Sequence, residues 1–231
     1  DMYTFLGRRC AQKLKYDRVV MVLSNRSRQK FNAPGSPWTA VPQMQAVLNQ
    51  VAARQNLLFF VNNEGSHTPF EHYDRQNTPF VPVATHFQNP AAQAQEVNNA
   101  YDSTIHYTDE FFRRVTEAVQ HRPFVYIYVS DHGEYLGHDG MWGRAALGER
   151  HVSYHATTGC RVGMFVLYNE AFERLHPHFA TALQQLRTNA ALTVAHEHLF
   201  HTLLGLFKLQ TPYYNETLDL TISAGGKTFT H

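Results

Sequence analysis

The sequence has few cysteines, no long apolar run and almost no net charge. Its 231 residues include 2 cysteines, Cys10 and Cys160, which do not form a Cys-x-x-Cys metal motif and could equally be one disulfide or two free thiols. No apolar run approaches the roughly 18 residues that a transmembrane helix needs. A formal net charge of +1 gives no basic field, so we expect no nucleic-acid partner.

The composition is otherwise that of a globular protein. Hydrophobic residues make up 43% of the chain and aromatic residues 13%, which is enough to build a core. We therefore expect a single domain over residues 1–231. The 15 histidines are a high count and suggest a metal or phosphate site without locating it. No signal peptide is visible and Asp1 is not an initiator, so we expect a piece of a longer protein.

Short apolar runs alternate with segments of helical spacing. The predicted strands cover residues 18–23, 57–61, 124–129 and 161–168. The predicted helices cover residues 39–54, 91–120, 170–186, with a break near Pro177, and 193–206. The core-facing stripe predicted for the longest helix consists of Val97, Tyr101, Ile105, Thr108, Phe112, Val115 and Val119. This alternation predicts an α/β fold with a mainly parallel central sheet and helices on both faces.

The stretch FVYIYVSDHGEYLGHDG, residues 124–140, carries the strongest candidate site. Asp131 and His132 directly follow a predicted buried strand, and chemistry in open α/β sheets gathers at such strand ends. A carboxylate and an imidazole suit zinc, at about 2.0–2.2 Å. We therefore predict that Asp131 and His132 bind one zinc ion, and that Glu134 either orients the histidine or is solvated. The other reading is an Asp that caps a helix and a His that hydrogen-bonds to it.

Four segments in order resemble the phosphoethanolamine transferases of Gram-negative envelopes, within the alkaline phosphatase and sulfatase superfamily. They are NNEGSHTPF (62–70), AYDSTIHYTD (100–109), SDHGE (130–134) and AHEHLFHTLLGL (195–206). SDHGE alone is moderately specific, whereas four segments in the family's order are strongly so. The resemblance implies an alkaline phosphatase/sulfatase-like fold.

The resemblance also implies roles for residues outside the zinc pair. It implies that His67 contacts the phosphate or a second metal, although a loop histidine that caps the next turn is an equal alternative. The family has a histidine at the position that the spacing gives to Arg144, so this sequence departs from the pattern there. His151 could supply that group through a shifted loop, or Arg144 could bind phosphate oxygens bidentately. His196 begins a predicted helix, whose N-terminus favours anions, and is a candidate for substrate binding.

The family's threonine nucleophile and an acidic zinc ligand would precede the strand at 18–23. The 17 residues before Arg18 show no apolar strand followed by a Thr-containing turn, and the resemblance places Ser24 on a different strand. We therefore expect the C-terminal part of a periplasmic catalytic domain, truncated at its N-terminus, that lacks the nucleophile and at least one metal ligand. Membrane association would come from an absent N-terminal region, and the fragment alone is expected to be inactive.

The resemblance implies a zinc-dependent transfer of phosphoethanolamine from phosphatidylethanolamine to an envelope glycan or lipid. The acceptor would be lipopolysaccharide or periplasmic glucan, the intermediate a covalent phospho-threonine, and the location the periplasmic face of the bacterial inner membrane. Two alternatives remain open. One is a sulfatase or phosphodiesterase hydrolase of the same fold, and the other is a non-catalytic zinc- or glycan-binding module.

Overall fold

The computed structural model divides the chain into two compact units. The first unit comprises Asp1–His121 and Tyr126–Leu167, and the second comprises Arg122–Val125 and Tyr168–His231. The structure describes residues 18–23, 40–52, 55–63, 65–70, 76–84, 89–137, 140–143, 159, 161–189 and 194–222. The single domain expected from the sequence stays a prediction, and each unit is described by itself below.

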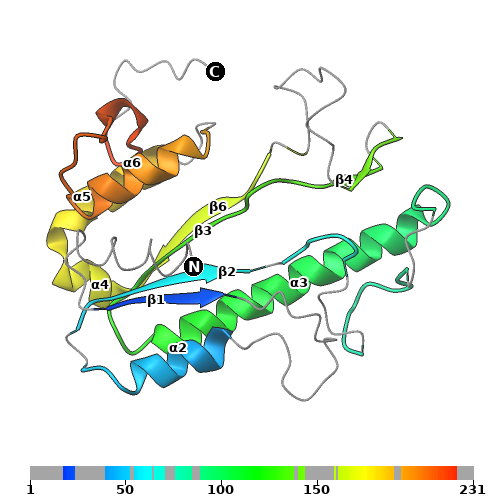
Figure 1. Cartoon of the computed structure of the whole chain (residues 1–231), viewed down its shortest axis with the longest axis horizontal. Coiled ribbons are helices and arrows are strands. Elements are labelled where there is room, and N and C mark those ends of the chain that lie inside the picture. The colour runs from blue at the N-terminus through cyan, green and yellow to red at the C-terminus, as the bar shows by residue number, and fades with distance from the viewer. Residues whose placement is uncertain are drawn as a thin grey trace. The chain divides into compact units, whose positions relative to one another are not determined.

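Six strands are described, and they lie mainly in the first unit (Figure 1). They are β1 (Arg18–Leu23), β2 (Leu57–Asn62), β3 (Val125–Val129), β4 (Tyr135–Leu136), β5 (Trp142–Gly143) and β6 (Met164–Tyr168). Strands β1 and β2 pair in parallel, whereas β4 and β5 form a short antiparallel ladder. The apolar runs of the sequence thus become strands at the predicted places.

Strands β3 and β6 pair with each other and run antiparallel. The amide of Ser130, after β3, donates to the carbonyl of Gly163, before β6, at 3.2 Å, and the amide of Asn169 donates to the carbonyl of Phe124 at 3.4 Å. The end of one strand therefore lies opposite the start of the other. The α/β class is as predicted, but the described strands form three two-stranded sheets, and only β1–β2 is parallel. Apolar patterning predicts a strand but not which way its neighbour runs. The burial predicted for the strand before Asp131 is only partial, because all residues of β3 are half-buried.

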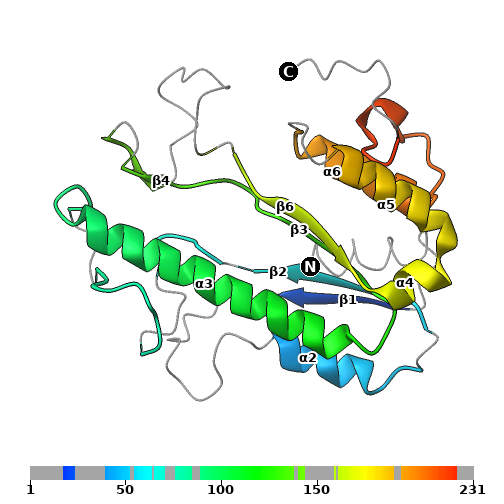
Figure 2. The same cartoon turned by 180° about the vertical axis from the view of Figure 1, so that it is seen from behind.

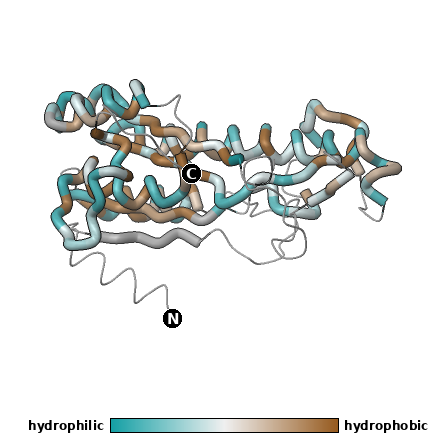
Figure 3. Tube along the Cα trace, turned by 90° about the horizontal axis from the view of Figure 1, so that it is seen from above, coloured by the Kyte–Doolittle hydropathy of each residue, from teal (hydrophilic) through white to brown (hydrophobic). Residues whose placement is uncertain are grey.

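Helices α2 (Ala40–Leu48) and α3 (Ala94–Val119) belong to the first unit, where α2 contacts both β1 and α3. The two helices lie side by side in both views (Figure 1, Figure 2). Hydrophobic and hydrophilic residues alternate along the traces of the helices, as amphipathic helices require (Figure 3). The predicted stripe of α3 is wrong at Ile105, whose side chain is 48% exposed, whereas the polar residues Ser103 and Thr104 are buried.

The first half of α3 packs on a small apolar cluster. Its buried members are Phe70, Ala84, Val97 and Ala100, and Val83, Tyr101, Tyr107, Leu136 and Trp142 pack against them. The second half of α3 places Phe112 against aromatic rings of the β3–β6 pair, with ring centroids 4.8 Å from Tyr128 and 5.1 Å from Phe165. One helix therefore braces both the β4–β5 hairpin and the strand that leads to Asp131.

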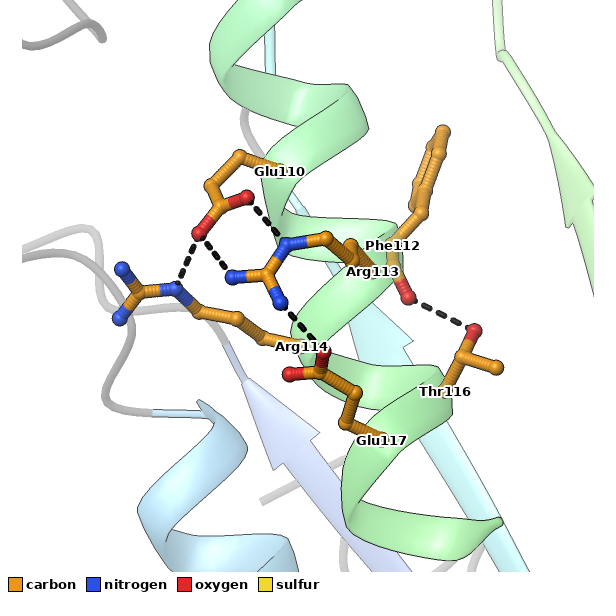
Figure 4. Close-up of polar contacts among 6 residues, drawn as sticks. All are labelled: Glu110, Phe112, Arg113, Arg114, Thr116 and Glu117. Carbon is orange, nitrogen blue, oxygen red and sulfur yellow. Dashed lines mark hydrogen bonds and ion pairs between the residues drawn. The ribbon is translucent and has the colours of Figure 1, made fainter.

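The outward face of α3 carries a chain of ion pairs (Figure 4). Glu110 accepts hydrogen bonds from Arg113 at 2.6 Å and from Arg114 at 2.8 Å, and Arg113 also pairs with Glu117. The partners lie three or four residues apart, which is the spacing of neighbours on one face of a helix. Because these pairs are exposed to solvent, they add little to the stability of the helix.

The second unit is helical. Its elements are α4 (Glu170–Leu175), α5 (Pro177–Asn189), α6 (Glu197–Leu206) and the 3-10 turn η3 (Glu216–Leu218). The side chain of Asn169 caps α4 by accepting from the amide of Phe172 at 3.0 Å. The predicted break near Pro177 is confirmed, because proline fits the first position of a new helix. Among the described residues, none of the helices combines the length and apolarity needed to cross a membrane.

Candidate functional site

The turn after β3 holds Asp131 and His132 in a fixed relation. The amide of His132 donates to Oδ1 of Asp131 at 3.0 Å, and the hydroxyl of Ser130 donates to the carbonyl of His132 at 2.9 Å. The amide of Gly133 donates to the carbonyl of Gly159 at 2.8 Å, which ties the turn to a later segment. The Asp131 side chain is 87% exposed, whereas that of His132 is 20% exposed. The carboxylate is therefore accessible and the imidazole is held in place beside it.

The hydrogen bond of the His132 ring defines which nitrogen can bind a metal. Nδ1 lies 2.8 Å from the carbonyl oxygen of Gly133, which can only accept, so Nδ1 carries the hydrogen and the neutral ring keeps its lone pair on Nε2. The carboxylate of Glu134, only 6% exposed, lies 3.9 Å from the same Nδ1. A carboxylate near the far nitrogen of a histidine orients the ring and raises its basicity as a ligand. The burial of Glu134 argues against the solvated role, but 3.9 Å is longer than a hydrogen bond, so its orienting role stays a prediction.

The pair fits zinc in chemistry and in spacing. Nε2 of His132 and Oδ2 of Asp131 are 3.8 Å apart. Two ligand atoms that share a tetrahedral zinc at about 2.0–2.2 Å lie roughly 3.3–3.6 Å apart, so a small side-chain rotation suffices. Within the described ranges, no group of three or more His, Cys, Asp or Glu side chains is arranged to hold a metal. Zinc binding by Asp131 and His132 therefore stays a prediction, with two ligands from the described part of the chain.

His67 lies in the turn that follows β2. Its side chain is exposed, and Nδ1 lies 2.5 Å from the carbonyl oxygen of Thr68, so Nε2 again keeps the lone pair. A Cβ built on Gly143 would lie 3.9 Å from the hydroxyl of Thr68, so the His67 turn sits beside β5. Strand β4, the partner of β5, begins directly after Glu134. The two candidate segments are thus neighbours through the β4–β5 ladder, although His67 forms no hydrogen bond or ion pair with Asp131 or His132 in the described structure.

Two tyrosines that sequence reasoning did not select lie near the zinc pair. Burial, and to a lesser extent the charge of Glu134, raises the pKa of Tyr101. Burial also raises the pKa of Tyr128, which the charge of Asp131 raises further. Both phenols therefore stay protonated at neutral pH and can donate hydrogen bonds, but do not act as bases. The sequence signal that could have identified them is their position: Tyr101 lies in the segment AYDSTIHYTD, and Tyr128 lies in the strand before SDHGE.

Arg144, His151 and His196 complete the set of predicted site residues. Arg144 and His151 lie outside the described residues, and their roles stay predictions. His196 lies in the second unit, exposed, immediately before α6, without a capping hydrogen bond from its side chain to the helix. It therefore precedes a helix N-terminus as predicted, and its role in substrate binding stays a prediction. Ser24 and both cysteines also lie outside the described residues.

Comparison with known proteins gives one family. Residues 13–209 match the family model described as Sulfatase. The chain is 26% identical over 162 residues to phosphoethanolamine transferase EptA of Salmonella typhimurium, covering 68% of this chain and 28% of that protein. It is 28% identical over 178 residues to EptA of Helicobacter pylori, covering 73% of this chain and 31% of that protein. The chain thus spans less than a third of the length of these relatives.

Solved structures agree with the sequence relatives. The soluble domain of lipooligosaccharide phosphoethanolamine transferase A from Neisseria meningitidis superposes with a TM-score of 0.73 at 25% identity, covering 91% of this chain and 68% of that one. The C-terminal periplasmic domain of phosphoethanolamine transferase EptC from Campylobacter jejuni gives a TM-score of 0.68 at 19% identity, which shows the fold alone. The resemblance to phosphoethanolamine transferases and the sulfatase-like α/β fold are confirmed, and the chain belongs to the sulfatase family.

Proposed function

We propose that this chain is the C-terminal part of the catalytic domain of a zinc-dependent phosphoethanolamine transferase. The observation that carries the proposal is the Asp131–His132 pair, with its two donor atoms 3.8 Å apart at the end of β3. The names of the curated relatives support the reaction class. The family match over residues 13–209 supports the fold in which the pair lies.

The ligands of this chain are Asp131 and His132, with Glu134 orienting the imidazole. Their hard oxygen and borderline nitrogen donors suit zinc, and the remaining ligands lie outside the described residues. When bound, zinc neutralises charge on phosphoryl oxygens and lowers the pKa of a bound hydroxyl.

The proposed reaction moves phosphoethanolamine in two displacements. The hydroxyl of a threonine outside residues 1–231 attacks the phosphorus of phosphatidylethanolamine, and diacylglycerol leaves with the proton. A hydroxyl or phosphate of the acceptor then displaces the threonine from phosphorus. His67, and His151 or Arg144, would hold the phosphoryl oxygens during both steps. A loose phosphoryl transition state depends on such positioning and charge more than on covalent assistance.

The acceptor in this proposal is an envelope glycan or lipid, lipopolysaccharide or periplasmic glucan. The named activities of the relatives support it, as one of them is a Kdo(2)-lipid A phosphoethanolamine transferase of Escherichia coli. The proposed location is the periplasmic face of the inner membrane, as the resemblance to envelope phosphoethanolamine transferases implies. His196, at the start of α6, is the residue of the second unit that we propose for substrate binding.

The test is the substitution Asp131→Ala in the intact protein, with zinc content and product formation measured together. Removing one ligand carboxylate should lower zinc affinity by at least about 10-fold and abolish transfer from a labelled phosphatidylethanolamine analogue. The control is Glu170→Ala, whose side chain is also 87% exposed and whose loss removes only a surface ion pair. Normal zinc and normal product in the Asp131 variant would refute the proposal.

The family description itself, Sulfatase, favours a hydrolase of the same fold as the alternative. The same assay separates the two activities. A transferase labels the added lipopolysaccharide or glucan, whereas a phosphodiesterase releases labelled phosphoethanolamine into water whether or not an acceptor is present. Equal release with and without the acceptor would favour the hydrolase.

A further inference from the structure

Two neighbouring hydroxyls on α3, those of Ser103 and Thr104, are buried and reach loops far away in the sequence. Thr104 contacts the hydroxyl of Ser66 at 2.7 Å, and Ser103 contacts the hydroxyl of Thr78 at 2.5 Å. Polar side chains of this kind are costly to bury unless they are hydrogen-bonded. Their presence inside α3 therefore needs a reason beyond helix formation, and the loops that they hold provide one.

The hydroxyl of Thr104 has two partners. It donates to the carbonyl oxygen of Tyr101 at 2.6 Å and to the hydroxyl of Ser66 at 2.7 Å, so its one hydrogen serves two acceptors. The result is a chain from Ser66 to Thr104 to the backbone of α3. Removing the central hydroxyl would leave both neighbours without this partner.

The same turn is anchored on its other side by Phe70. The amide of Phe70 donates to the carbonyl of His67 at 3.0 Å and closes the turn. Phe70 has a left-handed φ of 55°, a conformation that residues other than glycine rarely adopt. Its buried ring packs edge-on against Tyr101 at 5.2 Å, which holds it there. Ser66 and Phe70 thus contact the same turn of α3, through Thr104 and Tyr101, and the exposed residue His67 lies between them in the sequence.

We propose that Thr104 is a positioning residue for His67. The proposal rests on the proposed function, in which His67 holds phosphoryl oxygens. Thr104 touches no substrate, and acts by fixing the backbone next to His67 through Ser66. The imidazole is exposed, and within the described part of the chain its hydrogen bond is to the carbonyl of Thr68 in its own turn, so its place depends on that backbone. A displacement of about 1 Å at such a group can cost about 100-fold in rate.

The experiment compares three variants of α3 in the intact protein. Thr104→Val keeps the shape and removes the hydroxyl, Thr104→Ser keeps the hydroxyl, and Thr116→Val removes a hydroxyl that bonds only to the carbonyl of Phe112 in the same helix. We expect Thr104→Val to lower kcat by about 10- to 100-fold with KM changed by less than about 2-fold. Thr104→Ser should restore kcat, and Thr116→Val should leave it unchanged. A loss that serine does not restore, or an equal loss in Thr116→Val, would overturn the proposal.

A second readout separates this proposal from the proposed function. In the full chain with labelled histidine, NMR signals of the His67 ring are assigned with His67→Gln. Thr104→Val should shift or broaden the His67 signal and leave that of His132 unchanged, and an unchanged His67 signal would overturn the proposal. If the wild-type protein shows no transfer, the proposed function fails, and the ring signal alone decides on the positioning. If Thr104→Val does not fold, Ser66→Ala removes the same bond from the less buried side and takes its place.

Discussion

Substitution of Gly205 by alanine should destabilise the second unit, although alanine is ordinarily the better residue in a helix. Gly205 lies inside α6, and a Cβ built there would overlap the carboxylate of Asp219, with Cγ only 2.6 Å and Oδ1 2.8 Å away. Asp219 is buried and cannot swing into solvent without breaking its own bonds. Its Oδ2 accepts from the hydroxyl of Tyr214 at 2.5 Å, and its Oδ1 accepts from the amide and hydroxyl of Thr221 at 2.8 and 2.7 Å.

The magnitude follows from weighing two effects. Replacing glycine by alanine in a helix gains about 1 kcal/mol of intrinsic propensity. Each hydrogen bond to a buried carboxylate contributes about 1.5–3 kcal/mol. Displacing Asp219 enough to clear the new methyl group breaks at least two of its three bonds, so the net loss is about 2–5 kcal/mol. For a chain of this length, that lowers Tm by roughly 4–20 °C.

The assay is thermal unfolding of Gly205→Ala followed by circular dichroism. Gly163→Ala is the control, because a Cβ there meets nothing within 4 Å. The double variant with Asp219→Ala isolates the overlap, since alanine at 205 should then cost little or stabilise. A Tm for Gly205→Ala at or above that of the wild type would refute the reasoning. So would the same loss in the Asp219→Ala background, because the overlap would then not be its cause.

Three further predictions concern other parts of the chain. Two arginines lower the pKa of Glu110 to about 2, so its contribution is complete above the ordinary pKa of 4.5 and disappears as pH falls through about 2. Glu110→Gln should therefore lower the free energy of unfolding by at most about 0.5 kcal/mol at pH 7, because the pair is exposed. The difference from wild type in thermal melts should shrink below pH 4.5, and a constant difference would contradict this. Asn169→Ala removes the cap of α4 and a hydrogen bond to the carbonyl of Arg122, and should lower the free energy of unfolding, measured in urea, by about 2 kcal/mol. Asn169→Asp should lose less because it keeps the cap, and equal losses in the two variants would contradict the prediction. Phe70→Ala should cost about 3–5 kcal/mol in urea unfolding, against about 1 kcal/mol for Phe70→Leu, and no cost would show that the ring is not buried as described.

The Asp131–His132 pair illustrates how much of a candidate site can be predicted from one sequence. Adjacency in the sequence places Asp131 and His132 on one turn, and the apolar run before them makes that turn the end of a strand. The spacing of their donor atoms, 3.8 Å, and the orientation of the ring toward Gly133 are results of folding. The roles of Tyr101 and Tyr128 could not be predicted, because tyrosines at apolar spacing are most simply interpreted as core.

Helix α3 shows the same division within one element. Its existence and its ends, predicted at 91–120 and found at Ala94–Val119, followed from periodicity alone. Its buried face was predicted in part: Val97, Val115 and Val119 are buried as expected, whereas the structure exposes Ile105 and buries Thr104. A hydroxyl becomes a core residue only where another part of the chain supplies its partner, here Ser66 from 38 residues earlier.

The sequence by itself determined the α/β class, the strand that leads to Asp131, the family resemblance and the break at Pro177. These depend on local properties, namely apolar patterning, turn chemistry and short ordered motifs. Only the tertiary structure decided that β3 and β6 run antiparallel, that Glu134 is buried beside His132, and that α3 holds the His67 turn. Those features depend on contacts between residues far apart in the sequence. The conformational preferences of short segments do not determine which distant segments meet.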